Sequence, residues 1–248
     1  MDFVEINNTK VYYYDDPDDP IVSYLKSGKL HGKVGYDLIS PYLNSKTGTI
    51  IDCGAGIGTF SIEPALKGFQ VIAIENNAKK NECLSETFSN HSNVTCKDSF
   101  SSIGELKDTH QEDIVLIRYA LDGHEIPVMI SSMDTINKYT PLILLEVNIL
   151  SLIDNGSSLF EIIDLLESNR YHCFLYNGAN FLIKLDKNSR FPFCHMALVC
   201  MHESTIVNLL GKITFGSFLS HDMMNDLIRD SKKNYINEKC QQYLESIS

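Results

Sequence analysis

The sequence predicts an α/β protein: a doubly wound, mostly parallel sheet of seven strands with helices on both faces. Short apolar runs alternate with helical stretches over residues 47 to 202. A glycine-rich turn follows the first apolar run and opens a helical stretch. Strand and helix alternation requires right-handed crossovers, and these place helices on both faces of a parallel sheet. Ligands of such proteins bind at the carboxyl ends of the strands.

The seven expected strands are short and apolar, which is typical of strands buried on both faces of a parallel sheet. Between them, hydrophobic residues recur at helical spacing. The expected strands are 47–53, 69–75, 93–97, 113–118, 141–147, 171–176 and 197–201, and the expected helices are 59–67, 77–88, 125–138 and 158–169.

Two further segments flank this core. Alternating Val11 and Tyr13, followed by a turn-rich run of Asp and Pro, predict a small hairpin and then a helix in residues 1–46. Residues 203–248 are expected to form a helical tail, with apolar side chains at roughly helical spacing. That stripe favours packing onto the core over a homodimer or protein-partner interface. We therefore divide the chain into 1–46, a core of 47–202, and 203–248.

The overall charge and hydropathy restrict the classes of partner. A formal net charge of -11 argues against nucleic acid, because binding phosphates needs clustered Lys and Arg. The longest apolar stretch, 140–153, is interrupted by Glu146 and Asn148 and is shorter than the ~20 residues of a spanning helix. The first residues show neither a basic start nor an apolar segment typical of a secretory signal. We expect a cytoplasmic protein that does not span a membrane.

The seven cysteines give no sign of a metal site or a disulfide framework. Their number is odd, no CxxC pair occurs, and no histidines cluster at metal-ligand spacing. We expect reduced, mostly buried thiols and no metal.

The most informative stretch is the glycine turn DCGAGIGTF, residues 52–60. Glycines allow the backbone to turn tightly and to approach a ligand, and the following helix offers unpaired amides. A dinucleotide site needs GxGxxG, whereas position 59 is Thr and the spacing is GxGxG. This disfavours a nicotinamide-dependent oxidoreductase, while S-adenosylmethionine has no pyrophosphate to hold. The competing interpretation is a turn with no ligand.

Acidic residues follow three successive expected strands. Glu75 is placed to accept both hydroxyls of a ribose, Asp98 to accept from an adenine amino group, and Asp52 to hold an ammonium group directly or through water. A single acid at a strand end is more often a solvated residue or a helix cap. Three together favour a nucleoside site. The expected cofactor-binding residues are Asp52, Gly54, Ala55, Gly56, Glu75, Asn76, Asp98, Ser99 and Arg118.

With these motifs in this order, residues 10–200 resemble the Rossmann-like class I methyltransferases, and more narrowly the FkbM family. The resemblance is carried by DCGAGIGTFS, VIAIENN, IRYALDGHE (117–125) and PLILLEV. It implies S-adenosylmethionine as cofactor and methyl transfer, usually to a hydroxyl of a sugar, glycolipid or other small molecule. It also implies cofactor positions at Asp52, Gly54, Gly56, Glu75 and Asp98.

One position departs from the family. Ala120 stands where the family usually has an aspartate at the end of the fourth strand, near the methyl-transfer centre. Either another group does the work of that carboxylate, or the chain is a catalytically silent module that binds a partner protein.

The loop after the fourth strand holds the candidate catalytic bases Asp122, His124 and Glu125. His124 has the most suitable ordinary pKa, about 6.5, for accepting a proton near neutral pH. Its alternative is a surface histidine without a role. Glu125 is equally suited to cap the next helix.

Arg118 and Tyr119 end the fourth strand. We expect them close to the acceptor side, where they are suited to an anionic or sugar-like group. The alternative for Arg118 is an ion pair with Asp113 or Glu146.

Overall fold

The structure is a computed structural model that describes residues 1–43, 47–101, 103–104, 106, 112–176, 181–185, 194–209 and 214–216. It divides into two compact units. The first contains Met1–Ala120 and Val128–Leu144, and the second contains Leu121–Pro127 and the described chain from Leu145 onward. Most of the expected tail 203–248 lies outside the described residues.

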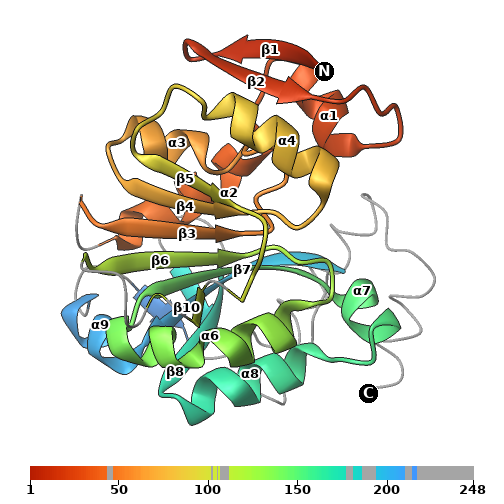
Figure 1. Ribbon diagram of the computed structural model, residues 1–248. Helices are drawn as coiled ribbons and strands as arrows, with labels where there is room; N and C mark the ends of the chain where they lie inside the picture. Colours follow the sequence, from red (N-terminus) through yellow and green to blue (C-terminus); the bar gives the residue numbers. More distant parts are fainter. Residues whose placement is uncertain are drawn as a thin grey trace. The chain divides into compact units, whose positions relative to one another are not determined.

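The first unit contains sheet strands in the order β5-β4-β3-β6-β7 (Figure 1). β3 pairs in parallel with both β4 and β6, and β4 pairs in parallel with β5. Their carboxyl ends therefore lie at one edge. The strands are β3 (Thr49–Cys53), β4 (Gln70–Ile74), β5 (Val94–Lys97), β6 (Ile114–Tyr119) and the first residues of β7 (Leu142–Asn148).

Helices of the first unit pack against this sheet, with α3 against β4 and α4 against β5. Side chains fix where two of them begin. Asp19 accepts from the amides of Ile21 and Val22 at the start of α1, and Asn77 accepts from two amides at the start of α4. The helices are α1 (Pro20–Lys26), α2 (His31–Ile39), the 3-10 helix η1 (Ser40–Tyr42), α3 (Ile62–Leu66), α4 (Ala78–Thr87) and most of α6 (Glu125–Tyr139).

The N-terminal hairpin packs onto the same core. β1 (Asp2–Ile6) and β2 (Thr9–Tyr13) pair in antiparallel fashion. Val11 and Tyr13 belong to one apolar cluster with Leu84 and Phe88 of α4. The cluster also contains Ala55 of the glycine turn. The hairpin therefore packs in the same apolar cluster as α4 and the glycine turn.

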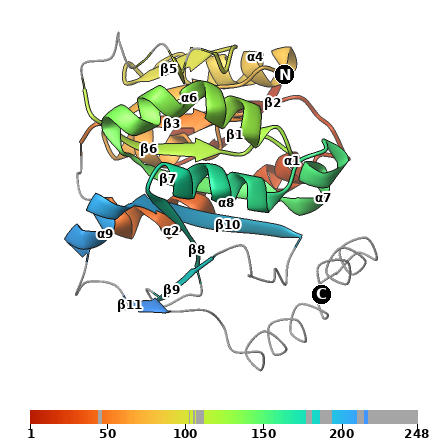
Figure 2. The same cartoon turned by 90° about the horizontal axis from the view of Figure 1, so that it is seen from below.

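In the second unit, the strand order is β7-β10-β8-β9-β11. β8 pairs antiparallel with both β10 and β9, while β11 runs parallel to β9 (Figure 2). A capping box of Ser158 and Glu161 starts α8, whose apolar face packs on β8. The elements are α7 (Ile149–Asp154), α8 (Leu159–Ser168), β8 (Tyr171–Tyr176), β9 (Phe181–Lys184), β10 (His195–His202), α9 (Glu203–Leu209) and β11 (Thr214–Gly216).

The expected fold class is confirmed: a mostly parallel sheet flanked by helices. The described residues contain nine strands in this sheet order where the sequence predicted seven, the additional two being β9 and β11. The helix expected at 59–67 begins only at Ile62, because the glycine turn continues to that point. Among the described residues, no helix combines the length and hydropathy needed to cross a membrane.

Within the described part of the chain, five cysteines are free thiols, and four of these are buried. Cys200 and Cys173 lie opposite each other on β10 and β8, with their sulfur atoms 3.4 Å apart. The hydrogen bond to Cys173, together with burial, raises the pKa of the Cys200 thiol well above its ordinary value. Cys194 is disulfide-bonded, contrary to the expectation of reduced thiols, because residue spacing carries no information about that pairing.

Candidate cofactor site

The glycine turn bends across the carboxyl ends of β3 and β4. Gly54, Gly56 and Gly58 have φ values of 81°, 58° and 91°, a left-handed region that favours glycine. The amides of Gly54 and Ala55 both donate to the carbonyl of Ile74, at 2.9 and 3.0 Å. The turn is therefore fastened to the end of β4.

The glycines of the turn differ in what surrounds them. A Cβ on Gly58 would lie 2.6 Å from Cε2 of Phe88 and 2.9 Å from Cδ1 of Leu84, so this glycine lets α4 pack closely. A Cβ on Gly56 would meet nothing within 4 Å. The Cβ direction of Gly56 is therefore open, in contrast to that of Gly58.

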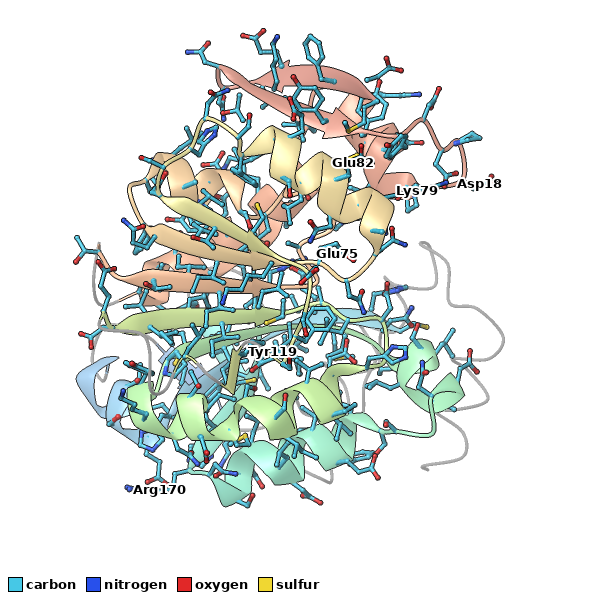
Figure 3. All side chains as sticks on the ribbon, viewed as in Figure 1. Asp18, Glu75, Lys79, Glu82, Tyr119 and Arg170 are labelled. Carbon is cyan, nitrogen blue, oxygen red and sulfur yellow. The ribbon has the colours of Figure 1, made fainter. Side chains whose placement is uncertain are left out.

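Glu75 lies just past the end of β4 and is joined to the turn (Figure 3). Its Oε2 accepts from the Gly56 amide at 2.9 Å, and its Oε1 accepts from the Asn77 amide at 2.8 Å. Only 7% of the residue is exposed. Each carboxylate oxygen has more than one acceptor direction, so both can still accept a hydroxyl. The structure thus brings Gly56 and Glu75 together, while their binding of a cofactor stays a prediction.

Asp52 is fully buried at the end of β3 and pairs with Arg118, its register partner on β6. Arg118 donates from an NH group to Oδ1 of Asp52 at 2.6 Å and to the carbonyl of Gly54 at 3.4 Å. Ser61 donates to Oδ2 of Asp52 at 2.7 Å. Both carboxylate oxygens of Asp52 therefore accept hydrogen bonds from protein side chains. Arg118 pairs with Asp52, whereas the expected partners were Asp113 or Glu146.

The guanidinium of Arg118 also lies over an aromatic ring. Its Cζ is 4.9 Å from the centre of the Phe60 ring, at a distance suited to a cation–π contact. Tyr36 of α2 meets the same ring edge-on, at 6.2 Å between centres. A Cβ on Gly32 would lie 2.3 Å from the Phe60 Cα, so α2 packs directly against the turn.

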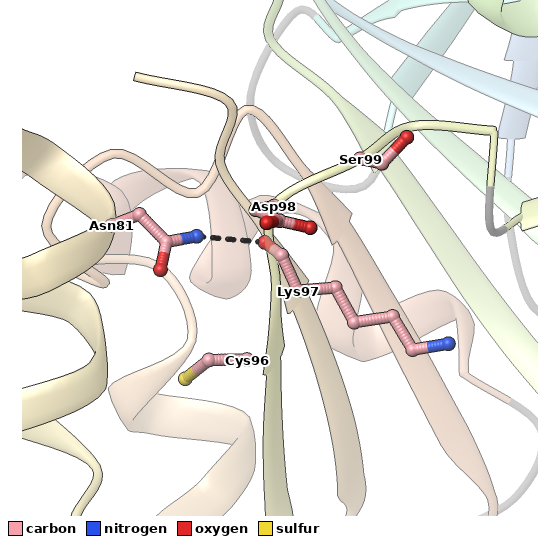
Figure 4. Close-up of a pocket in the computed structure, with 5 residues that line it drawn as sticks. All are labelled: Asn81, Cys96, Lys97, Asp98 and Ser99. Carbon is pink, nitrogen blue, oxygen red and sulfur yellow. Dashed lines mark hydrogen bonds between the residues drawn. The ribbon is translucent and has the colours of Figure 1, made fainter. Parts of the chain in front are cut away.

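A pocket of about 350 Å³ lies at the carboxyl end of β5 (Figure 4). Asp98 and Ser99, both expected to bind the cofactor, line it, and Ser99 has its hydroxyl 2.8 Å from that of Ser101. Asp98 is exposed and so is open to a ligand. The other lining residues are Asn81, Cys96 and Lys97.

Asn81 is the residue of this pocket that the sequence analysis missed. Its side-chain amide donates to the carbonyls of Glu75 and Lys97, at 2.7 and 2.8 Å. A single polar residue near the start of a helix gives no signal by itself. Of the remaining expected cofactor residues, Ala55 is buried in the turn and Asn76 is exposed.

The three candidate bases lie in the second unit, in the loop 121–127. Asp122 and His124 are exposed, and Asp122 has a positive φ of 49°. Nδ1 of His124 is 3.2 Å from the Leu121 carbonyl. A Cβ on Gly123 would lie 2.3 Å from the Ser151 carbonyl oxygen, so the loop requires glycine there.

Glu125 is buried at the start of α6, with 0% of the residue exposed. Its Oε1 accepts from the Leu121 amide at 3.0 Å, which closes the loop. Its buried Oε2 has no hydrogen-bond partner within the described part of the chain. In this conformation Glu125 holds the loop, and its function as a base stays a prediction.

Within the described residues, no group of three or more His, Cys, Asp or Glu side chains is arranged to hold a metal ion. At this edge of the first unit, the Glu75 carboxylate accepts from backbone amides, the Asp52 carboxylate pairs with Arg118, and Asp98 and Lys97 line the pocket. This donor set fits a polar organic ligand.

No family model and no curated protein sequence matches the chain. Solved structures do match. They include magnesium protoporphyrin IX methyltransferase from Synechocystis PCC 6803 with bound SAM, at 14% identity over 77% of this chain and 88% of that chain, TM-score 0.48. Precorrin-6y C5,15-methyltransferase from Geobacter metallireducens GS-15 matches at 17% identity over 68% and 87%, TM-score 0.46. An rRNA methylase from Streptococcus thermophilus matches at 13% over 68% and 94%, TM-score 0.47. At these levels of similarity, the matches describe the general architecture only.

Proposed function

We propose that the chain is an S-adenosylmethionine-dependent methyltransferase that binds its cofactor at the glycine turn of the first unit. One observation carries the proposal: Glu75 is fixed by the amide of Gly56, the glycine whose Cβ direction is open. A rigid, nearly buried carboxylate beside open backbone is suited to a ribose with two neighbouring hydroxyls. The spacing of the glycines, which does not fit a pyrophosphate, supports this choice.

The residues present fit the rest of this cofactor. Asp98, exposed at the pocket, can accept from the adenine amino group. The pair of Asp52 and Arg118 presents one negative and one positive group beside the turn, which suits an amino acid that carries an ammonium and a carboxylate. Contact between Asp52 and the ammonium is expected through water, because Asp52 is fully buried and both of its oxygens already accept from protein groups.

The bound cofactor supplies a methyl group on a sulfonium, which is already an activated leaving group. The protein then has to position the acceptor and to take up its proton. We propose that the acceptor is a hydroxyl of a sugar, glycolipid or other small molecule, as the FkbM resemblance implies. Asp122 and His124, the exposed bases of the loop, are the candidate proton acceptors, with Glu125 holding that loop.

Binding of the cofactor is tested by thermal shift and calorimetry with S-adenosylmethionine, S-adenosylhomocysteine and NAD. At a concentration 100 times the dissociation constant, S-adenosylhomocysteine should stabilise the folded chain by about 2.7 kcal/mol, and NAD should have no effect. No heat with the methyl donor at millimolar concentration would contradict the proposal.

The proton acceptor is tested by replacing His124. His124→Ala should lower turnover by roughly 10²-fold or more, since general bases contribute on that scale. The affinity for S-adenosylhomocysteine should stay the same. Asp122→Asn is the companion variant, and normal turnover in either variant removes that residue from the mechanism.

A second candidate is a catalytically silent module that binds a protein partner. The observation that favours it is Ala120, whose amide bonds to the Cys53 carbonyl at 3.0 Å and whose side chain offers no acidic group at the end of β6. This candidate predicts cofactor binding without any methylated product. A cytoplasmic location, and a homodimer or partner contact through residues 203–248, also stay predictions.

A further inference from the structure

Asn81 bridges the ends of two neighbouring strands. It lies on α4, and its Nδ2 donates to the carbonyl of Glu75, just after β4, and to the carbonyl of Lys97, the last residue of β5. The bond to Lys97 is visible in Figure 4. Both hydrogens of the amide nitrogen are used by these two carbonyls.

The chemistry of this bridge is specific to an amide. Two carbonyl acceptors require two donors on one atom, which Asp does not have and which Ser supplies only once. The remaining oxygen, Oδ1, accepts from the Ser85 hydroxyl at 3.3 Å, so the amide orientation is set on both sides. The Lys97 carbonyl also accepts from the Glu75 amide at 3.0 Å.

The bridge lies where the sheet pairing stops. The register of β4 with β5 ends at the pair of Ile74 and Lys97, so Glu75 and Asp98 follow the last paired residues. Asn81 holds the carbonyl of Glu75 itself and the carbonyl that directly precedes Asp98. It also lines the same pocket as Asp98.

We propose that Asn81 is a positioning residue that sets the separation of Glu75 and Asp98, and thereby the selectivity of the site for adenosine. The inference rests on the proposed function, in which Glu75 binds the ribose and Asp98 the adenine amino group. Asn81 acts through these two carboxylates by fixing the backbone at both strand ends.

The chain contains a matched control at the other end of β5. Asn93 directly precedes β5, and its Nδ2 also donates to two backbone carbonyls, those of Ala65 at 2.9 Å and Phe69 at 2.8 Å. Both asparagines are half-buried. Asn93 does not line the pocket, because β5 separates it from Asp98. Replacing Asn81 or Asn93 by Ala therefore removes two hydrogen bonds to backbone carbonyls, in one case at the end of β5 and in the other at its start.

The experiment compares Asn81→Ala and Asn93→Ala in the full chain, with binding of S-adenosylhomocysteine and S-inosylhomocysteine measured by calorimetry. The inosine ligand has a carbonyl in place of the amino group that Asp98 is expected to bind. We expect the unmodified chain to prefer the adenosine ligand by about tenfold, as for one hydrogen bond to a charged group. Asn93→Ala should keep this preference.

Asn81→Ala should weaken adenosine binding by about tenfold or more and bring the selectivity ratio close to one. Loss of stability alone does not change that ratio, so it separates positioning from general destabilisation. If Asn81→Ala does not fold, Asn81→Ser, which keeps one donor, is expected to show an intermediate ratio.

Three results overturn the inference. The first is an unchanged selectivity ratio in Asn81→Ala. The second is a selectivity ratio that falls as much in Asn93→Ala as in Asn81→Ala. Either result overturns the inference and leaves the proposed function intact. If the unmodified chain does not bind S-adenosylhomocysteine, the proposed function fails and the inference fails with it.

Discussion

Gly56 and Gly58 share a left-handed backbone but have opposite surroundings, which gives a test by matched substitutions. Gly56→Ala should cost about 1 kcal/mol of unfolding free energy, from the backbone conformation alone. Gly58→Ala should cost roughly 2–4 kcal/mol, because its Cβ also collides with Phe88 and Leu84. Urea denaturation measures both.

The affinity for ligand should fall more in Gly56→Ala than in Gly58→Ala, the reverse of the order expected for stability. Gly56→Ala should lower the affinity for S-adenosylhomocysteine by at least about tenfold, since its Cβ enters the space assigned to the ligand. Normal affinity in this variant would show that the open side of Gly56 is not the ligand side.

The pair of Asp52 and Arg118 makes a second prediction at this scale. Asp52→Asn leaves a nearly buried guanidinium without its charged partner, and breaking a buried pair in this way should cost about 3–5 kcal/mol. The double variant Asp52→Asn with Arg118→Met should recover part of that loss, because it removes both charges. The measurement is a double-mutant cycle by urea denaturation.

One result of this double-mutant cycle would contradict the predicted recovery of stability. If the double variant is less stable than Asp52→Asn alone, Arg118 stabilises the turn mainly through Gly54 and Phe60 and not through Asp52.

How much of the candidate site could be predicted depended on where each residue lies along a strand. Glu75 and Asp98 were proposed as site residues because each directly follows an expected strand, β4 in one case and the short β5 in the other. The partner of Arg118 was not, since it depends on the register that places Asp52 opposite on β3. Asn81 gave no signal, because its two hydrogen bonds are to carbonyls at two strand ends that only the folded chain brings together.

At the scale of elements, apolar runs that end in a turn residue were predicted well. β3, β4 and β6 agree with the expected strands to within two residues at each end, because they are buried and flanked by turns. β9 was missed, since four residues with no alternation or turn signal do not distinguish a strand from a loop. The helix α7 was missed because it directly follows β7 and extends its apolar run.

The region where β8, β10 and α9 meet contains two histidines with altered acidity. Burial lowers the pKa of His172, and nearby Lys184 lowers it further, although Glu203 and Glu167 oppose this. Nε2 of His172 is 3.7 Å from Oε1 of Glu203. Burial also lowers the pKa of His202, which lies edge-on to the ring of Tyr171.

These shifts predict a loss of stability in acid. Both folded-state pKa values lie below the ordinary 6.5, so the unfolded chain binds protons more readily. Stability is therefore complete above about pH 6.5 and falls as the pH decreases below it. Urea midpoints between about pH 7.5 and pH 5.5 measure the slope.

The double variant His172→Gln with His202→Gln is the control for this slope. It should show a shallower dependence over the same range, because the two groups that take up protons on unfolding are gone. An equal slope in the variant would assign the effect to other groups. Glu203, whose pKa is lowered by its hydrogen bond to Arg170, stabilises the folded chain fully above about pH 4.5 and adds to the pH dependence only below that value.

At the scale of the whole molecule, charge is the property that bears on partners. The chain has 32 acidic residues against 21 Lys and Arg. We therefore predict that it does not bind an RNA of about 20 nucleotides at roughly 0.15 M salt, because the net charge repels phosphates.

Fluorescence anisotropy with labelled RNA tests this prediction, with salt varied around the physiological value. Binding that weakens steeply with salt would show that the cations are gathered on one surface in spite of the net charge. Binding without salt dependence would indicate recognition of bases. Either result would widen the class of acceptors.

Buried thiols occur in both units, so their chemical labelling can measure local unfolding in each unit separately. Cys53 and Cys83 lie in the first unit, and Cys173 and Cys200 lie in the second. The chain has no tryptophan whose fluorescence could follow unfolding. Alkylation reaches a buried sulfur only when the surrounding structure opens, so the labelling rate of each cysteine, read by mass spectrometry, reports how often its own unit opens.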